Sequence, residues 1–506
     1  MNWKNLRQST SILMLVIIIS KIVGLFRDLI LAQYFGTSNI SDAYLIASSV
    51  PVLLFYFIGH SLSTAYIPMY NKIKYGSNIS NALSYSNNLL NISLLLSCLL
   101  VIILFLYPNY VVQIFASGFD AETIAISSRL IKLSASSIFF MCVVHIFSGY
   151  LQANNSFLPP AAVSLPRNVV LVISIICASS YGLDILGWGL LLSFIFEFLF
   201  LFPFVLRRGY IYNFFIDIKD RNLKETSYII MPILLGMSVS QVNKIIDRSI
   251  ASNVVSGGIS ALSYASIINN AVQEILVTGI ITILFSNCSK LVAQGKNKAV
   301  QANLSSTVKT MFFCLIPASI GIILFAEPIV EFILYRGNFN TNSIVMTTGA
   351  LKCYTIGLVF LAIRDTLVKV FYAYKKTRIT TITSIVAILL NILLNLFLSK
   401  FWGINGLALA TSFSAIFHCL ILYFIFQKKI MPMKNRDNIM FFCKCLLSSA
   451  IMGFVGQYAY SYCVVNKLSS FNSLLITMFI CFSFYNILTF CFKCNPMSKY
   501  INNIYK

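Results

Sequence analysis

Long apolar segments recur along almost the whole chain, and no other feature limits its fold so strongly. Each segment is long enough to cross about 30 Å of hydrocarbon as an α-helix. Only 10% of the residues are charged and 58% are hydrophobic, whereas roughly a quarter are charged in soluble proteins, so the surplus apolar surface must face lipid. We therefore predict an all-α polytopic membrane protein with about fourteen transmembrane helices. The predicted spans are 9–35, 42–68, 84–107, 124–151, 159–181, 184–206, 227–254, 260–289, 305–326, 342–373, 379–399, 404–427, 439–460 and 470–492.

The most polar stretch of the chain, 207–226, divides the spans into comparable halves. We predict an N-terminal lobe of six spans, this stretch as a cytoplasmic connector, and a C-terminal lobe of six spans. A basic linker and two further spans with a cytoplasmic tail follow. The predicted parts are therefore 1–206, 207–226, 227–427, 428–438 and 439–506.

The two lobes resemble each other in sequence. Arg27-Asp28 near the end of span one lies 220 residues before Asp247-Arg248 in span seven, and Tyr44 and Tyr264 keep the same offset. Transporters are commonly built from such repeats, with a binding site between them. We therefore predict two pseudo-symmetric six-helix lobes.

Basic residues are distributed unevenly between the two sides of these spans. With the N-terminus inside, the inner connections and tail hold roughly 22 lysines and arginines, against three on the outer side (Arg336, Lys400 and Lys467). This bias predicts that both termini are cytoplasmic. The basic residues occur in short clusters between apolar runs, a pattern of membrane topology, so we expect no nucleic-acid partner despite the net charge of +22.

A first group of ionisable residues lies in spans one and two. An ionisable residue inside the bilayer costs several kcal/mol unless it is paired or hydrated, so Lys21, Arg27 and Asp28 are candidate functional residues, as is Asp42 at the start of span two. Lys21 and Asp28 are seven residues apart and share a helix face. The alternative is that Arg27 pairs with Asp42 only to lock the helices together. On chemistry alone, Asp28 and Asp42 fit structural ion pairs better than ligand contacts.

A second group lies in spans seven and eight. Lys244 and Arg248 are four residues apart on one helix face, with Asp247 beside them and Glu274 in the next span. We expect Asp247 and Glu274, like Asp28, to form ion pairs that support the binding residues. The alternative is that the Asp247–Arg248 pair only locks helices together. Four basic side chains lie within these spans (Lys21, Arg27, Lys244 and Arg248), which predicts an anionic, phosphate-bearing ligand between the lobes.

Other polar residues in the spans are weaker candidates. Glu197 is expected at the membrane interface, and Arg364-Asp365 with Lys369 as a local ion-pair group. His145 could relay protons, but a lone histidine is more often a packing residue. The chain contains no phosphate-binding loop, nucleophile elbow or paired-histidine zinc motif, so we expect neither an enzyme, nor a metal site, nor a bound cofactor.

Several motifs occur in an order that resembles one family. Arg27-Asp28, Phe35-Gly36 and Ser41-Asp42-Ala43-Tyr44 are similar to the first hairpin of the MurJ (MviN) family, the bacterial lipid II flippases. The similarity runs from about residue 9 to 427, and the two extra spans fit the fourteen-helix layout of that family. It continues at Ser63-Thr64-Ala65-Tyr66-Ile67-Pro68, Gln241 through Ser252, Leu334-Tyr335-Arg336-Gly337-Asn338-Phe339, Phe371-Tyr372-Ala373 and Lys376-Thr377-Arg378.

The resemblance implies a fold and a substrate. It implies two six-helix lobes around a cationic cavity, within the multidrug/oligosaccharidyl-lipid/polysaccharide (MOP) exporter superfamily. The substrate would be lipid II, an undecaprenyl-pyrophosphate saccharide, moved from the inner to the outer leaflet of the bacterial cytoplasmic membrane by alternating access. Arg27, Asp42 and Lys21 map onto residues that line the cavity in that family. We expect a multi-pass monomer in the lipid bilayer, coupled to the membrane potential or to Na⁺.

The chain also departs from the family pattern. Phe55-Tyr56 stand where many relatives carry paired arginines, Gly59-His60 replaces an acidic-glycine pair, and Ile267 stands at an arginine position in span eight. Lys244 and Arg248 would compensate for these losses.

Two other functions are compatible with the sequence. One is a flippase for a different lipid-linked saccharide (teichoic acid, capsule or O-antigen units) or a multidrug exporter of the same fold, although such relatives usually stop at twelve spans. The other is a non-transporting membrane scaffold, which has little reason to bear the cost of buried basic clusters.

Overall fold

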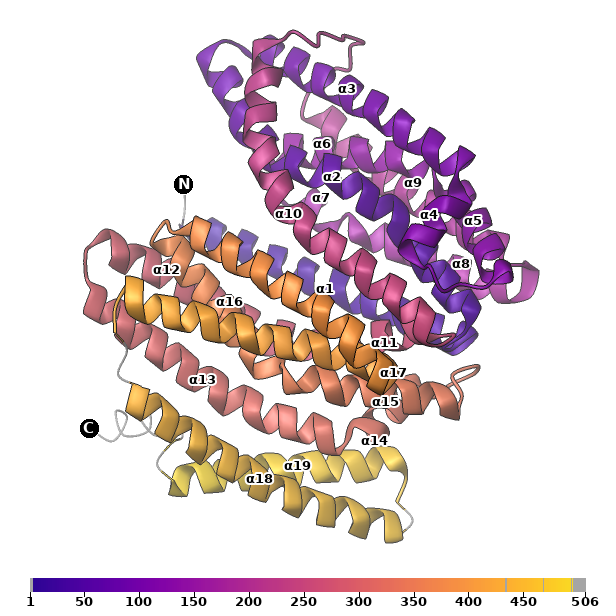
Figure 1. The fold of residues 1–506 in the computed structure, drawn as a ribbon. Helices are drawn as coiled ribbons and strands as arrows, with labels where there is room; N and C mark the ends of the chain where they lie inside the picture. Colours follow the sequence, from indigo (N-terminus) through magenta and orange to yellow (C-terminus); the bar gives the residue numbers. More distant parts are fainter. Residues whose placement is uncertain (1–2, 433–434, 467, 493, 495–506) are drawn as a thin grey trace. The chain divides into compact units, whose positions relative to one another are not determined.

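The computed structural model describes residues 3–432, 435–466, 468–492 and 494, and every regular element in these residues is an α-helix. Figure 1 shows long helices joined by short connections. This is the arrangement expected in lipid, because a helix satisfies all of its backbone hydrogen bonds within one segment. The prediction of an all-α membrane protein is confirmed.

The elements of the first half follow the predicted spans closely. Spans four and five are each divided into two helices. The bounds are α1 (Trp3–Phe35), α2 (Asn39–Gly76), α3 (Ile79–Leu106), α4 (Pro108–Phe115), α5 (Ala121–Ser134), α6 (Ser137–Ala153), α7 (Leu158–Ala162), α8 (Ser164–Tyr181) and α9 (Asp184–Arg207).

The second half repeats this order of elements at a nearly constant distance in sequence. For example, α13 begins at residue 297 and α3 at residue 79, an offset of 218, and the short helices α14 and α4 begin at residues 326 and 108, again 218 apart. The bounds are α10 (Arg221–Val254), α11 (Gly258–Leu276), α12 (Thr278–Ala293), α13 (Asn297–Leu324), α14 (Ala326–Leu334), α15 (Thr341–Ile356), α16 (Leu358–Ala373) and α17 (Thr377–Lys429), followed by α18 (Asn435–Val465) and α19 (Ser470–Cys491). The repeat inferred from Arg27 and Asp247 therefore extends to the helices themselves.

Each of the fourteen predicted spans falls on a helix or on a bent helix pair. Among the described residues, eight helices are long and apolar enough to cross a membrane, or eleven if each bent pair is one span. The long helix α17 contains a break at Gly403, whose φ of 55° separates the predicted spans 379–399 and 404–427. The bends recur in both halves, at 48° between α5 and α6 and at 45° between α15 and α16.

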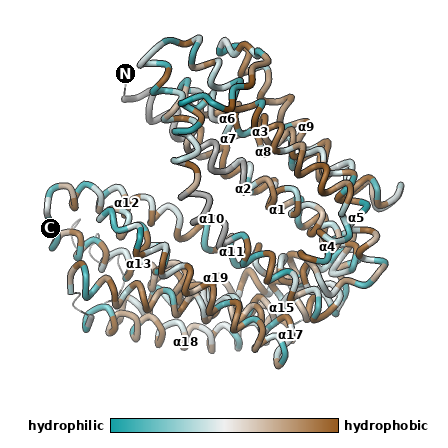
Figure 2. Tube along the Cα trace, turned by 45° about the horizontal axis from the view of Figure 1, so that its top comes forward, coloured by the Kyte–Doolittle hydropathy of each residue, from teal (hydrophilic) through white to brown (hydrophobic). Residues whose placement is uncertain are grey.

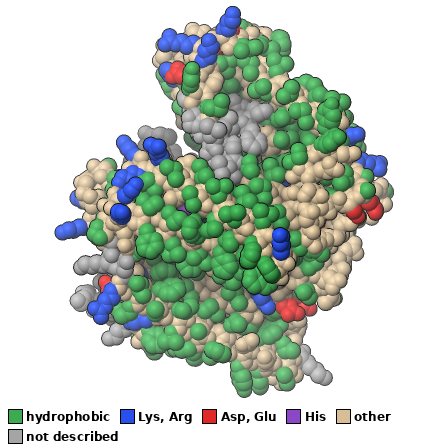
Figure 3. Space-filling view, viewed as in Figure 1, with side chains coloured by type: hydrophobic (Ala, Val, Ile, Leu, Met, Phe, Trp, Pro, Cys, Tyr) green, Lys and Arg blue, Asp and Glu red, His purple; other side chains and the backbone are tan. Residues whose placement is uncertain are grey.

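Large apolar side chains remain exposed along the flanks of the helices. Leu99 is 61% exposed, Leu393 65% and Phe479 73%. Figure 2 shows apolar residues along the helices and polar residues near many of the connections, and in Figure 3 hydrophobic side chains cover much of the visible surface. Exposure on this scale is unfavourable in water and indicates contact with lipid tails.

The chain forms two compact units. The first contains Met1–Ser260 together with the loop Arg336–Phe339, and the second contains Ala261–Tyr335 and Asn340–Lys506. In the second unit, α12, α13, α16 and α17 enclose a continuous apolar core. The two additional helices α18 and α19 pack on α13 and α14 through a smaller cluster that includes Phe325, Leu474 and Tyr485.

The connector after α9 is held on α3 by buried asparagines. Asn88 donates from Nδ2 to the carbonyl of Asp217 (2.9 Å) and accepts from its backbone N–H (2.8 Å). Asn91 donates to the carbonyl of Phe215 (3.0 Å). The helix α10 begins at Arg221, six residues before the predicted span at 227, because the side chain of the preceding aspartate caps its first turn.

Candidate functional site

The basic residues of span one, Lys21 and Arg27, lie at a cavity between α1 and α8. The helix α1 packs mainly against α8, and the cavity between them has a volume of about 390 Å³. Lys21 and Arg27 line it from α1, and Arg167 and Asn168 line it from α8. Three cations from two helices therefore face one space.

The guanidinium of Arg27 is held in place by two partners. Its Nε and Nη2 donate to the same carboxylate oxygen of Asp28 (2.9 and 2.6 Å), and its Nη1 donates to Oδ1 of Asn168 (3.2 Å). The side chain of Arg27 is 27% exposed and that of Asp28 is 17% exposed. The ion pair is thus formed with the neighbour in sequence and not with Asp42, which was the alternative considered above.

Sequence reasoning overlooked Arg167. It lies on α8, where its Nη1 is 3.8 Å from Oε1 of Glu197 and its guanidinium carbon is 4.2 Å from the ring centroid of Phe194. Its Nε is buried and has no hydrogen-bond partner among the described residues. The signal that could have found it is the one used for Arg27, a single arginine inside a predicted span.

Glu197, which was expected at the membrane interface, is buried among the helices of the first unit. The residue is only 5% exposed and faces Arg167 within the first unit. Hydropathy gives the depth of a residue along its own helix, but the burial of Glu197 depends on α8 and α6 packing against α9.

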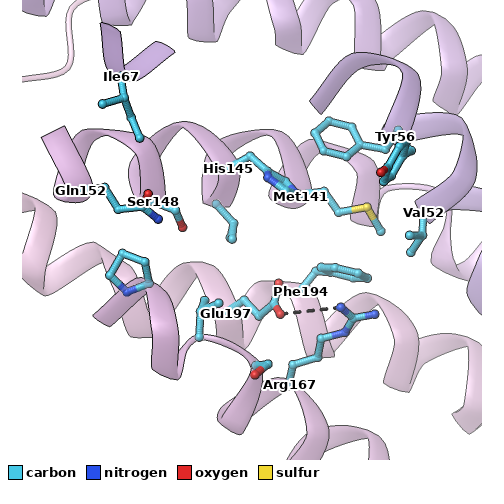
Figure 4. A pocket seen from close by; sticks show the side chains of 15 residues that line it. Val52, Tyr56, Ile67, Met141, His145, Ser148, Gln152, Arg167, Phe194 and Glu197 are labelled. Carbon is cyan, nitrogen blue, oxygen red and sulfur yellow. Dashed lines mark ion pairs between the residues drawn. The ribbon is translucent and has the colours of Figure 1, made fainter. Parts of the chain in front are cut away.

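A larger cavity of about 570 Å³ adjoins the first one (Figure 4). Arg167 and Ser164 line both cavities. The larger cavity is bounded by α2, α6, α8 and α9, and Phe55 and Tyr56 form part of its wall. Arg167 therefore places a cation in the cavity where the family resemblance would put the paired arginines of span two.

The span-seven residues lie elsewhere in the first unit. Arg248 donates from Nη1 to the carbonyl of Leu45 (3.4 Å) and to the hydroxyl of Ser49, so it reaches α2. Asp247 accepts a hydrogen bond from Nδ2 of Asn243 (3.0 Å). Lys244 is exposed, and neither it nor Arg248 lines either of the two cavities.

Two further predicted site residues, Asp42 and Glu274, do not line the cavity at α1. Asp42 is 1% exposed and accepts a hydrogen bond from the backbone N–H of Ser260 (2.7 Å), so it caps the first turn of α11. It lines neither cavity. Glu274 is exposed near the end of α11 and belongs to the second compact unit.

The second unit contains a local ion pair of the same design as Arg27–Asp28. Nε and Nη2 of Arg364 donate to one oxygen of Asp365 (3.0 and 2.7 Å), and Gln273 donates to the other (3.0 Å). The expected pair is therefore present. Lys369 instead lies 5.8 Å from the ring centroid of Phe285.

Comparisons with known proteins agree on one family. Residues 31–479 match the family model described as "Lipid II flippase MurJ". The lipid II flippase of Thermosipho africanus is 29% identical over 437 residues, covering 86% of this chain and 87% of that protein. A probable lipid II flippase of Buchnera aphidicola subsp. Baizongia pistaciae is 27% identical over 425 residues, covering 83% of each.

Solved structures give a similar result. A structure described as "Lipid II flippase MurJ, inward closed conformation" has a TM-score of 0.81 at 28% identity, covering 95% of this chain and 98% of the other. An inward-facing transporter of the multidrug resistance MATE family has a TM-score of 0.71 at 12% identity, covering 81% of this chain and 94% of the other. The second likeness concerns the fold alone.

Proposed function

Because this chain belongs to the MurJ family of lipid II flippases, we propose that it moves the undecaprenyl-pyrophosphate-linked peptidoglycan precursor from the inner to the outer leaflet. The observation that carries the proposal is the family match over residues 31–479. The cavity that three cations line between membrane helices supports it. The chain is a multi-pass membrane protein, and its family transports rather than catalyses.

The charge at the cavity suits a diphosphate. Lys21, Arg27 and Arg167 face it, and Asp28 and Glu197 are the carboxylates paired with the two arginines. Cations thus exceed carboxylates by one. Arginine and lysine bind phosphate oxygens through charge-assisted hydrogen bonds, which are stronger than neutral ones and gain strength where water is scarce. We assign Lys21 and Arg27 to the pyrophosphate, with Arg248 and Lys244 as further contacts along the path.

The direction of transport follows from the proposed orientation. With both termini in the cytoplasm, an inside-negative potential contributes about 2.3 kcal/mol per charge per 100 mV. Outward movement of two net negative charges would gain roughly 4–5 kcal/mol, which is enough to drive flipping without ATP. We therefore propose that the membrane potential, or a Na⁺ gradient, energises a monomeric transporter in the bacterial inner membrane without a bound cofactor.

The function is tested by replacing a host's own flippase. The host flippase is depleted, this chain is supplied, and lipid II reaching the outer leaflet is measured with an externally added enzyme that cleaves its headgroup. Appearance of cleaved lipid II supports the proposal. If lipid II stays inside while another lipid-linked saccharide appears outside, the substrate is wrong and the alternative flippase function is correct.

The proposed cations are tested in the same assay. Arg27→Ala and Arg248→Ala should abolish flipping while the protein still inserts, because each removes a guanidinium from the path. Arg129→Ala is the matched control, since this arginine is 69% exposed on α5 and pairs with Asp184 at the surface. If Arg27→Ala and Arg248→Ala both flip lipid II at the wild-type rate at equal membrane levels, these two arginines have only a structural role.

A further inference from the structure

We propose that Arg167 is the second arginine of the diphosphate site and that the 570 Å³ cavity beyond it receives the saccharide of the lipid-linked substrate. The inference rests on the proposed function, because it takes the substrate to be a diphosphate lipid that carries a sugar. Arg167 lines two adjoining cavities, one rich in cations and one with mixed aromatic and polar walls.

Of the two arginines at the smaller cavity, Arg167 has the more available donors. The guanidinium of Arg27 is already engaged, with Nε and Nη2 on Asp28 and Nη1 on Asn168. The nearest approach between Arg167 and Glu197 is 3.8 Å, beyond the 2.7–3.2 Å of ordinary N–H···O hydrogen bonds. Glu197 thus offsets the charge of Arg167 without satisfying its five N–H donors, and Nε is buried without a partner among the described residues.

The guanidinium of Arg167 is also held in a defined position. Its carbon lies 4.2 Å from the ring centroid of Phe194, within the range of a cation–π contact. A guanidinium fixed by a ring and a distant carboxylate loses little freedom when it binds, and its planar fork can bind two oxygens of one phosphate. A phosphate would supply the short, charged acceptors that Glu197 does not.

The larger cavity has the lining that a sugar requires. His145, Ser148 and Gln152 project from one face of α6, as their spacing of three and four residues dictates, and Figure 4 shows them across the cavity from Arg167 and Glu197. These side chains offer donors and acceptors to hydroxyl and acetamido groups. Aromatic rings of the wall, such as Phe194, offer a surface for the apolar face of a pyranose.

Size and position agree with this assignment. A volume of about 570 Å³ lies within the roughly 300–1,000 Å³ typical of small-molecule sites. Gln152 lies next to the last residue of α6, and Pro160 lies in α7, which begins the following span. In the proposed orientation both are at the cytoplasmic end, so the cavity is placed to take a headgroup from the inner leaflet.

The test uses the full-length protein in lipid nanodiscs and two probes that share undecaprenyl diphosphate and differ in whether the headgroup is attached. One probe is undecaprenyl diphosphate, and the other is undecaprenyl diphosphate carrying the lipid II headgroup. Arg167→Ala should weaken both by roughly 10- to 100-fold, the range for loss of charge-assisted hydrogen bonds. Ser148→Leu, which narrows the larger cavity, should weaken binding of the headgroup-bearing lipid and leave binding of undecaprenyl diphosphate unchanged.

Two further variants separate binding from folding. Arg167→Ala combined with Glu197→Gln removes the ion pair without leaving a buried carboxylate, so it should melt near the wild-type temperature and still bind both probes weakly. Arg129→Ala should bind both probes as the wild type does. Wild-type affinity in the double variant would overturn the role of Arg167, and equal effects of Ser148→Leu on both probes would overturn the sugar cavity.

The outcomes also distinguish this inference from the proposed function. If the wild type binds the lipid II probe tightly and every variant does so equally well, the subsite assignment fails and the flippase function stands. If the wild type binds neither diphosphate lipid, the proposed function fails and the subsite assignment fails with it.

Discussion

Asp42 offers the sharpest test of a structural role against a ligand-binding role. Its carboxylate is 1% exposed and accepts the backbone N–H of Ser260 at 2.7 Å in the first turn of α11. Asp42→Ala leaves that buried donor unsatisfied, which costs about 1–3 kcal/mol. Loss of the negative charge at the helix N-terminus costs about 0.3–1 kcal/mol more. We therefore expect a loss of about 1–4 kcal/mol for Asp42→Ala.

Asp42→Asn separates the hydrogen bond from the charge. The amide oxygen can still accept from the Ser260 N–H, so this variant should lose only the charge contribution, about 1 kcal/mol or less. Thermal unfolding of the detergent-solubilised protein measures both variants, at roughly 1 °C per kcal/mol for a chain of this length. Ser260→Ala removes the hydroxyl and keeps the backbone N–H that Asp42 binds, so it measures the contribution of the Ser260 side chain separately.

Transport measurements complete the test. A capping role predicts that flux follows stability, so Asp42→Asn should retain most of it at equal membrane levels. If Asp42→Ala melts like the wild type, the capping role is wrong. If Asp42→Asn melts like the wild type but loses flux as completely as Asp42→Ala, the carboxylate acts on the substrate or its coupling ion.

Three other predictions test the fold around the site. Asn88→Leu removes two of the hydrogen bonds that hold the connector on α3, so limited trypsin digestion within 209–220 should become faster, and an unchanged rate would contradict this anchoring. Gly337→Ala should lower the melting temperature by an amount equivalent to about 1–3 kcal/mol, because φ is +59° and a Cβ would meet the Gln33 carbonyl. Gly209→Ala, with φ of +80° and open space around it, should cost less, and equal losses would mean that the collision is unimportant. Hydrogen bonds from the first turn of α5 hold the pKa of Asp120 below its usual range. The Asp120 cap therefore contributes to stability at neutral pH, and this contribution is lost only as the pH falls through the lowered pKa. A carbon-13 titration that gives a carboxyl pKa at or above the usual value would refute this.

The position of each span could be read from the sequence because it depends on local composition. A run of about twenty apolar residues enters lipid whatever its neighbours are, and lysines and arginines in the connections bias the side on which those connections lie. The repeat was also visible, since the 220-residue offset between Arg27 and Asp247 matches the offset of 218 between α3 and α13. Ion pairs between sequence neighbours, such as Arg364–Asp365, belong to the same class of local features.

The partners of the site residues were decided only by tertiary structure. Arg27 binds Asn168 across 141 positions, and Arg167 meets Glu197 only because α8 packs against α9. Asp42 resembled a cavity residue in the family pattern, but the end of α11 occupies its carboxylate. Hydropathy records what it costs a residue to leave water, and it carries no information about which distant group offsets that cost. The sequence by itself therefore determined that buried cations must find anionic partners, and the packing of the helices determined which of them open onto a cavity.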